Sequence, residues 1–243
     1  MPVFDSHVHC GLTLPLERIQ PLWDMGGIEG GVLFSPVEEI YDRFDPSFVD
    51  SPRYAESREN VHQYLESLRS EKRYIFWFVW NDFKIPGPDF LGIKWHRHSH
   101  EPDYLYETKE CEEIIEHICK RRMPVILEEE FSRTLMMVEK FSGRTVTIIP
   151  HFGGLNGGYE RLKDTGLFED PYVYVDTALA GSRQIEDFAA TYGVERILFG
   201  SDFPFGDPVE ECRKVKNIFS GEEQRKVLGE NLVHLLKSVR ASS

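Results

Sequence analysis

The sequence PVFDSHVH at residues 2–9 is a short strand-like run that ends in two histidines separated by one residue. Similar short apolar runs recur along the chain and alternate with stretches of helical periodicity. Near-continuous apolar runs of this length are typical of parallel strands that are buried on both faces. The sequence therefore predicts an α/β protein in which strands and helices alternate.

Eight strands are expected in total. They cover residues 2–9, 30–35 (GGVLFS), 73–80 (RYIFWFVW), 90–96 (FLGIKWH), 124–128 (PVILE), 145–151 (TVTIIPH), 172–176 (YVYVD) and 196–202 (RILFGSD). Helices are expected at residues 16–25, 55–72, 107–122, 133–141, 183–192, 208–219 and 222–239. This alternation over 243 residues favours one (β/α)8 TIM barrel domain spanning residues 1–243 over an open doubly wound sheet.

The overall charge argues against a nucleic-acid partner. The chain has 41 acidic and 28 basic side chains and a formal net charge of −13, whereas binding to a phosphate backbone needs basic surface. It contains no run of 18 apolar residues and no signal-peptide pattern, so no membrane partner is expected. Four cysteines without a C-x-x-C pair are typical of the reducing cytoplasm, which is the predicted location.

Ionisable side chains stand at the ends of six of the eight predicted strands. In a barrel of this kind the active site lies at the C-terminal ends of the strands. The residues concerned are Asp5, His7 and His9 in the first strand, Lys94, His96 and His98 at the fourth, Glu128, His151, Asp176 and Asp202. Their recurrence predicts one polar site at one mouth of the barrel.

The spacing of His7 and His9 suits a metal site. Side chains alternate across a strand, so residues two apart point the same way and can bind one cation. Imidazole nitrogens bind zinc at about 2.0–2.1 Å. Asp5 is expected to share this face, either to orient a ligand or as a buried aspartate bonded to the backbone. Cys10 is expected to point the other way and to serve packing.

The segments FDSHVH, GIKWH, PVILE, IIPHFGG and ILFGSDFP resemble, in this order, the successive strand motifs of the amidohydrolase superfamily. The resemblance is strongest to the branch that contains aminocarboxymuconate-semialdehyde decarboxylase and 2-pyrone-type hydrolases. The sequence VLGENLVHLL at residues 227–236 is similar to the closing helix of that branch. The ordered set covers nearly the whole chain and is specific for the superfamily, but it does not specify a substrate.

This resemblance implies roles for four residues. His7 and His9 match the metal ligands of the first strand. Asp202 matches the aspartate that ligates the metal and takes a proton from bound water. His151 matches a histidine that is either a second-metal ligand or a polarising acid/base group. The implied cofactor is zinc, with manganese as the alternative, as one ion or two.

Glu128 departs from the pattern of the family, which usually has a metal-binding histidine at the end of the fifth strand. A glutamate there can ligate the metal, can bridge two metals, or can mark a decayed site. Carboxylates bind zinc and also suit harder ions such as manganese. We predict that Glu128 is a ligand, because the other three family positions are intact.

The fourth strand supplies the residues predicted to contact substrate. His96 matches a histidine often found at this point in the branch, so it is expected in the wall of the site. Lys94 is expected to be buried against an acid or to bind a substrate anion, rather than to be the carboxylated lysine of some superfamily members. Arg97 either meets a substrate carboxylate or is a surface arginine. The irregular segment 38–52 is a candidate lid over the barrel mouth.

The predicted function is hydrolysis of an amide, ester or lactone bond in a small molecule by a metal-activated water. Asp202 and His151 are the predicted catalytic residues. Nonoxidative decarboxylation at the same metal site is the nearest alternative. A metal-dependent nuclease is disfavoured by the acidic charge, and a catalytically decayed binding barrel is the alternative from another class. A homodimer is a further possibility, because dimers are common among such barrels.

Overall fold

Eight parallel strands follow one another around the sheet in chain order. The computed structural model describes residues 2–45, 47–48, 52–68, 74–97 and 106–240. The strands are β1 (Phe4–His9), β2 (Gly30–Phe34), β3 (Tyr74–Trp80), β4 (Gly92–Arg97), β5 (Val125–Glu129), β6 (Thr147–Ile149), β7 (Val173–Asp176) and β8 (Ile197–Leu198).

Backbone hydrogen bonds between β1 and the segment after β8 close this sheet into a barrel. The amide of Ser6 donates to the carbonyl of Phe199 at 2.8 Å, and the amide of His9 donates to the carbonyl of Phe203 at 3.0 Å. In the opposite direction, the amide of Asp202 donates to the carbonyl of His7 at 2.8 Å. The protein is therefore the (β/α)8 barrel that the alternation of strands and helices predicts.

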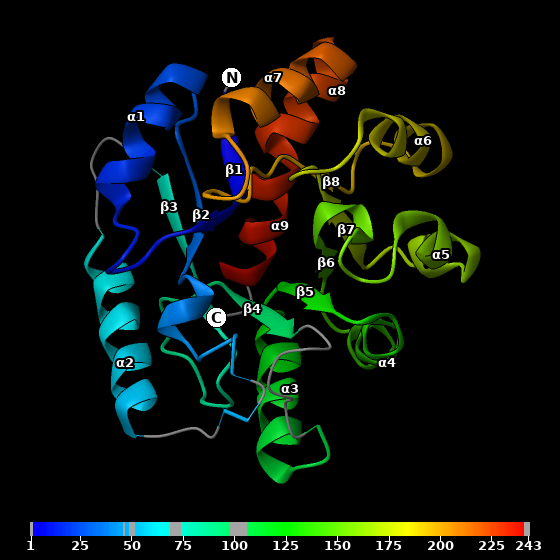
Figure 1. Ribbon diagram of the computed structural model, residues 1–243. Coiled ribbons are helices and arrows are strands. Elements are labelled where there is room, and N and C mark those ends of the chain that lie inside the picture. Colours follow the sequence, from blue (N-terminus) through cyan, green and yellow to red (C-terminus); the bar gives the residue numbers. More distant parts are fainter. Residues whose placement is uncertain (1, 46, 49–51, 69–73, 98–105, 241–243) are drawn as a thin grey trace.

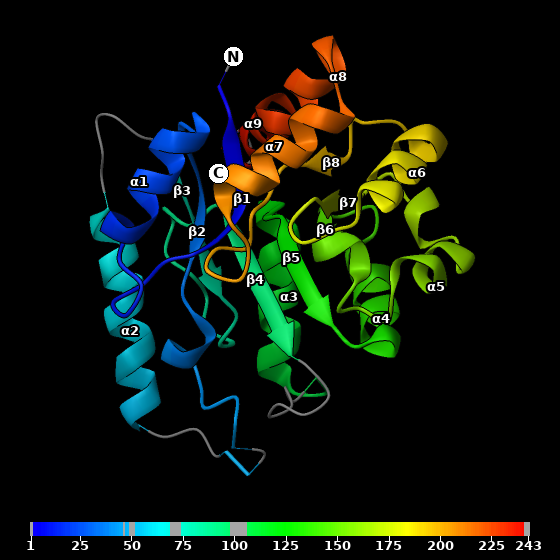
Figure 2. The ribbon, with the colours of Figure 1, turned by 45° about the horizontal axis from the view of Figure 1, so that its top comes forward.

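Helices surround the strands, as Figures 1 and 2 show for α1 to α7. They are α1 (Leu16–Gly26), α2 (Pro52–Ser67), α3 (Lys109–Arg121), α4 (Phe131–Phe141), α5 (Tyr159–Asp164), α6 (Ser182–Tyr192), α7 (Pro208–Ile218), α8 (Gly221–Arg225) and α9 (Asn231–Arg240). Short 3-10 turns lie at Val37–Glu39, Pro150–Gly153 and Leu167–Glu169, and a π turn spans Lys226–Glu230. Within the described residues, none of these helices is long and apolar enough to cross a membrane.

Side chains that alternate along the strands form two apolar cores. The outward-facing residues pack against the ring of helices, whereas the inward-facing ones fill the lumen. In β3 the inward set is Phe76, Phe78 and Trp80. Leu232 and Leu236 of α9 belong to the same lumen core, and α9 therefore covers the end of the barrel where the strands begin. The opposite end remains for a functional site.

A register shift in β1 decides which of its side chains reach the lumen. The pairing of β1 with β2 slips between Asp5 and Val8, so the simple alternation along β1 is broken once. After the slip, the rings of His7 and His9 lie 5.1 and 4.8 Å from the ring of Phe34, a residue of the lumen core.

Asp5 lies before this slip, and the expectation that it shares the face of His7 is wrong. Its carboxyl lies beside Trp23 of α1, which belongs to the outer core. One Asp5 oxygen also accepts hydrogen bonds from the backbone amides of His7 and Ser201 at 3.2 and 2.9 Å. Asp5 therefore fixes the backbone on both sides of the barrel closure. Cys10 packs in the outer core, as predicted.

The predicted elements are found, with differences at their ends. The predicted strands six and eight are too long, because β6 ends at Ile149 and β8 at Leu198. The helix predicted at residues 55–72 is α2, and residues 69–73 lie outside the described part of the chain. The helix predicted at residues 222–239 is interrupted by the π turn. The short helix α5 follows the glycine-rich turn at residues 153–158 and was not predicted as a separate element.

Asn231 anchors α9 to the barrel, which yields a first prediction. Its buried amide donates to the carbonyls of Val194 and Ile197 at 2.7 and 2.8 Å. Asn231→Ala leaves both carbonyls without this donor, so we expect a loss of about 1–3 kcal/mol in the free energy of unfolding. Urea denaturation measures this value. The exposed His234 of the same helix provides the control, since His234→Ala should change stability by less than about 0.5 kcal/mol. Equal midpoints for the two variants would contradict this anchoring role.

Candidate active site

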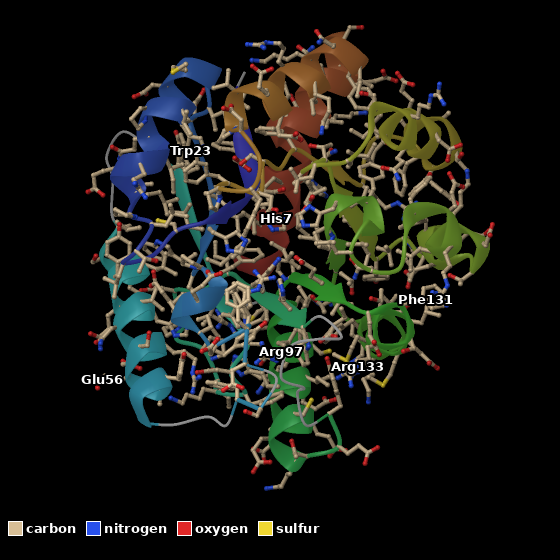
Figure 3. All side chains as sticks on the ribbon, viewed as in Figure 1. His7, Trp23, Glu56, Arg97, Phe131 and Arg133 are labelled. Atoms are coloured by element: carbon tan, nitrogen blue, oxygen red, sulfur yellow. The ribbon has the colours of Figure 1, made fainter. Side chains whose placement is uncertain are left out.

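Eight ionisable side chains converge at the C-terminal mouth of the barrel. Figure 3 shows one of them, His7, at the centre of the ring of strands, whereas Glu56 of α2 lies on the outer side. The strands supply His7, His9, Lys94, His96, Glu128 and Asp176, and the turns after β6 and β8 supply His151 and Asp202. Each of the eight is at most 6% exposed. The structure thus brings together every predicted metal-binding residue.

Three histidines are held in the orientation that metal ligands adopt. Nδ1 of His9 lies 3.2 Å from the carbonyl oxygen of Ser35, and Nδ1 of His151 lies 3.1 Å from that of Ala178. A carbonyl oxygen only accepts, so both Nδ1 atoms carry the hydrogen. Nδ1 of His7 donates in the same way to Asp176 at 2.7 Å. In a neutral ring, this leaves the Nε2 lone pair free for a cation.

The Nε2 atoms point toward Asp202. Its Oδ1 lies 3.3 Å from Nε2 of both His7 and His9. A tetrahedral zinc ion with bonds of about 2.1 Å holds its ligand atoms about 3.4 Å apart. The ligand atoms of these three residues all lie within 4.8 Å of one another. The chemistry and the spacing of the three residues therefore fit a divalent metal ion.

The electrostatics of this triad also suit a cation. Burial alone would raise the pKa of Asp202, but the nearby His7 and His9 outweigh it and lower the pKa to about 2, so the carboxylate is ionised. Burial and the charge of Lys94 lower the pKa of His7, despite the opposing effect of Asp176. A lowered pKa favours the neutral ring that a metal ligand needs.

His151 and Asp202 lie in strained turns at the mouth of the lumen. Both have positive φ, 55° and 56°, a region that non-glycine residues rarely adopt and that is enriched at active sites. Hydrogen bonds hold each turn in place. The amide of His151 donates to Asp176 at 3.0 Å, and the carbonyl of Asp202 accepts from the amide of Phe205 at 2.8 Å. The sequence predicted both residues as strand ends, whereas the structure places them in the turns that follow.

Glu128 is paired with a lysine and lies close to two histidines. Its Oε2 accepts from Nζ of Lys94 at 2.7 Å and lies 3.6 Å from Nε2 of His151, and its Oε1 lies 3.4 Å from Nδ1 of His96. Burial opposes ionisation, but His96 and Lys94 hold the pKa of Glu128 well below its usual range. With His7 and His151, Glu128 also forms a second group of potential metal ligands. Its predicted role as a ligand stays a prediction.

The same contact sets the charge of His151. Burial would lower the pKa of this histidine, but the adjacent Glu128 carboxylate outweighs that effect and raises the pKa to about 9. In the metal-free chain His151 is therefore an imidazolium at neutral pH. An imidazolium beside a cavity can donate a proton to a substrate.

A cavity of about 340 Å³ opens above the cluster. Its base is formed by His9, Glu128 and Asp202, and its walls by Val37, Arg43, His96, Leu155, Leu179 and Phe205. Arg43 belongs to the candidate lid, residues 38–52, and Val37 directly precedes it. Residues 46 and 49–51 of this segment lie outside the described part of the chain. Movement of this segment stays a prediction. His96 lines the cavity, and its predicted contact with substrate stays a prediction.

The wall residues other than His96 were missed in the sequence. They lie in the loops that follow β2, β6, β7 and β8. Because the loops after the strands form the active site of such a barrel, these loops could have been searched for cavity-lining residues in the sequence. Arg43 is the most informative of them, since it is the guanidinium among the described residues that line the cavity.

Arg97 has a different environment from Lys94 and His96. It follows them on β4 on the opposite face, its Nη1 donates to the carbonyl of His96 at 3.0 Å, and its guanidinium stacks 3.8 Å from the ring centre of Tyr41. It is not among the described side chains that line the cavity. A substrate-binding role for Arg97 stays a prediction, and His98 lies outside the described residues.

Comparisons with known proteins agree with this architecture. The model of the amidohydrolase family matches residues 87–236, from just before β4 into α9. The structure is similar to 2,6-dihydroxybenzoate decarboxylase from Rhizobium, with a TM-score of 0.75 and 14% identity over 98% of this chain and 99% of that one. The sequence matches none of the curated proteins with which it was compared.

Two further solved structures share the fold. A probable 2-pyrone-4,6-dicarboxylic acid hydrolase from Acinetobacter baumannii has a TM-score of 0.67 and 14% identity, over 98% of this chain and 100% of that one. A dihydroxybenzoic acid decarboxylase from Polaromonas, with bound manganese and the inhibitor 2-nitroresorcinol, has a TM-score of 0.68 and 15% identity, over 97% of both chains. At these identities the likeness concerns the fold.

Asp176 provides a test of the metal centre. Asp176 accepts hydrogen bonds from Nδ1 of His7 and from the backbone amide of His151. It therefore orients the ring of His7, a proposed metal ligand, and holds the turn that carries His151. We expect Asp176→Asn to weaken zinc or manganese binding by about 10- to 100-fold, as for other partners of ligating histidines. Isothermal titration of the metal-free protein measures the affinity. The exposed Asp164 gives the control variant Asp164→Asn, and equal affinities for the two variants would refute the orienting role.

Proposed function

We propose a reaction for this chain from one premise: it belongs to the amidohydrolase family, and members of this family are enzymes. The proposed reaction is metal-dependent hydrolysis of an amide, ester or lactone bond in a small molecule. The observation that carries the proposal is the convergence of two anchored histidines, His7 and His9, on the Asp202 carboxylate at the base of an open cavity. Zinc is the proposed ion and manganese the alternative, because imidazole and carboxylate ligands suit both.

The residues of the cluster divide the proton transfers between them. His7, His9 and Asp202 would hold the divalent ion, which when bound would lower the pKa of a water molecule from 15.7 to about 7 and so provide a nucleophile at neutral pH. The second oxygen of Asp202, 3.9 Å from Nε2 of His151, is the proposed proton acceptor. His151 is the proposed donor to the developing oxyanion or the leaving group, because its pKa is raised to about 9.

The cavity supports a small and mostly apolar substrate. Its volume of about 340 Å³ is at the lower end of the range for ligand pockets. Val37, Leu155, Leu179 and Phe205 offer apolar contact, and Arg43 adds a planar cation that suits a carboxylate. These features favour a compact organic acid or its lactone.

Decarboxylation is a second candidate because of a specific observation. His151, whose pKa is raised to about 9, lies 3.6 and 3.9 Å from Glu128 and Asp202, which line the cavity. A proton donor is what the carbon atom needs after carbon dioxide leaves. Two of the similar structures are decarboxylases of dihydroxybenzoates. A binding barrel without activity is the least supported alternative, since burying several convergent polar groups without a cation is costly.

Metal removal provides the first test of function. We expect dialysis against a chelator to abolish turnover of a panel of lactones, esters, amides and aromatic carboxylic acids, and added zinc or manganese to restore it. Hydrolysis releases acid without carbon dioxide, whereas decarboxylation releases carbon dioxide, so trapping the gas separates the two reactions. Full activity in the chelated protein, with metal content verified by elemental analysis, would sink the proposed chemistry.

His151→Asn tests the proton donor. We expect kcat/KM to fall by about 10²- to 10⁴-fold, because the general acid is lost. The content of bound metal should stay the same, because His7, His9 and Asp202 are intact. Steady-state kinetics and elemental analysis measure the two quantities, with His234→Asn, exposed on α9, as the control. Unchanged kcat/KM would exclude His151 as the acid.

A further inference from the structure

A second cavity, the side cavity, adjoins the main cavity that lies above the cluster. It has a volume of about 200 Å³ and is formed at the ends of β1, β2 and β8 by His9, Thr13, Leu14, Pro36, Val37, Glu38, Pro204 and Phe205. Three of these residues, His9, Val37 and Phe205, also line the main cavity. The two cavities therefore share a wall, and one molecule can occupy both.

The shared wall brings the side cavity next to the proposed metal centre. Nε2 of His9, a proposed ligand, lies 3.3 Å from Oδ1 of Asp202. The ring of Phe205 stands edge-on to the ring of His9, with 5.7 Å between the ring centres. Phe205 is 60% exposed, so its ring can turn aside without disturbing the packed core. A substrate bound beside His9 can therefore extend past Phe205 into the side cavity.

Hydrogen bonds to one buried carboxylate hold the side cavity in shape. Glu39 accepts from the backbone amides of Leu12 and Thr13 at 3.1 and 2.7 Å, and also from the Thr13 hydroxyl. These contacts tie the loop after β1 to the turn after β2. Gly11 permits their close approach, because a β-carbon at this position would lie 2.6 Å from Cδ of Pro36. The side cavity is therefore preformed, as ligand sites usually are.

The lining of the side cavity suits an apolar, uncharged group. Five of its eight residues are apolar, namely Leu14, Pro36, Val37, Pro204 and Phe205. The carboxylate in its lining belongs to Glu38, whose Oε1 lies 3.9 Å from Nη1 of Arg43 in the main cavity. A substrate carboxylate would meet a like charge in the side cavity and an opposite charge in the main cavity. The volume of about 200 Å³ accommodates a benzene ring, since a cavity of about 150 Å³ can hold one.

The position of His151 decides which part of a substrate enters the side cavity. Oδ1 of Asp202 faces His9, whereas its Oδ2 faces Nε2 of His151 at 3.9 Å, so the proposed proton donor and the side cavity lie on different sides of this carboxylate. Hydrolysis adds the oxygen of water to the acyl carbon and breaks the bond to the leaving oxygen or nitrogen, which takes up a proton. A leaving group that takes this proton from His151 lies on the side of His151, and the acyl group then lies on the side of His9.

We infer that the side cavity binds the acyl group of the substrate, and that this group is uncharged, apolar and about the size of a benzene ring. The inference rests on the proposed function, since it concerns the substrate of the same metal centre. It narrows the proposed substrates from amides, esters and lactones to amides and esters with a bulky apolar acyl group. A carboxylate of such a substrate lies in its leaving group, in the main cavity with Arg43.

Binding of two hydroxamic acids to the zinc-loaded protein tests this inference without turnover. Acetohydroxamic acid and phenylacetohydroxamic acid carry the same metal-binding group and differ by a phenyl ring. By isothermal titration we expect wild type to bind the phenyl compound about 10- to 100-fold more tightly, because the side cavity buries the ring. Leu14→Trp fills the side cavity and should abolish this preference. Leu12→Trp is the control and should keep it, since Leu12 is an exposed leucine of the same loop and is not among the described residues that line either cavity.

A crystal structure of wild type with phenylacetohydroxamic acid gives a second readout that needs no variant to fold. A phenyl ring between Leu14 and Pro204 supports the inference, whereas a ring beside Leu155 and Leu179 in the main cavity overturns it. Equal affinities of wild type for the two compounds, or a preference that a folded Leu14→Trp retains, also overturn the inference but leave the proposed function intact. A wild type that binds no zinc, or neither compound when loaded with zinc, contradicts the proposed function itself, and the inference with it.

Discussion

The site depends on one constraint: a charge placed in the lumen of this barrel needs a partner, because burial removes most of its contact with water. Directly below the polar cluster lies an apolar layer that includes Ile126, Ile148 and Leu198. Above this layer, each carboxylate of the cluster fixes the position or the charge of a neighbouring histidine or lysine side chain. Asp176 fixes the ring of His7, Glu128 attracts Lys94 and holds His151 protonated, and Asp202 draws the histidine Nε2 atoms together. The geometry of the active site thus follows from the compensation of buried charge.

The parts of the structure that follow from strand periodicity could be predicted from the sequence. The order of strands and helices was one such part, and so was the inward direction of His7 and His9, which are two residues apart. Alternation also puts Arg97 on the face of β4 opposite to Lys94 and His96, but its guanidinium stacks on Tyr41 of the lumen core. Its predicted substrate-binding role therefore stays a prediction.

The parts that depend on irregular backbone could not be predicted in this way. The slip in β1 sends Asp5 to the outer core, and no feature of FDSHVH marks it. The left-handed conformations of His151 and Asp202 depend on hydrogen bonds to Asp176 and Phe205, which are distant or lie in a turn. Arg43 reaches the cavity from a segment without periodicity. In each case a tertiary contact, and not a local pattern, selects the conformation.

The cluster is compatible with either of the two proposed reactions. A cation held by His7, His9 and Asp202 would polarise a substrate oxygen, and a protonated His151 nearby would supply a proton. Hydrolysis delivers that proton to a leaving group, whereas decarboxylation delivers it to carbon. The choice between the two reactions would then depend on the cavity walls, where Arg43 and the apolar side chains could orient the substrate. If Arg43 directs a carboxylate away from the cation, a carbonyl meets the nucleophile and hydrolysis follows; if it leaves the carboxylate beside His151, the bond to carbon dioxide is the one exposed to cleavage.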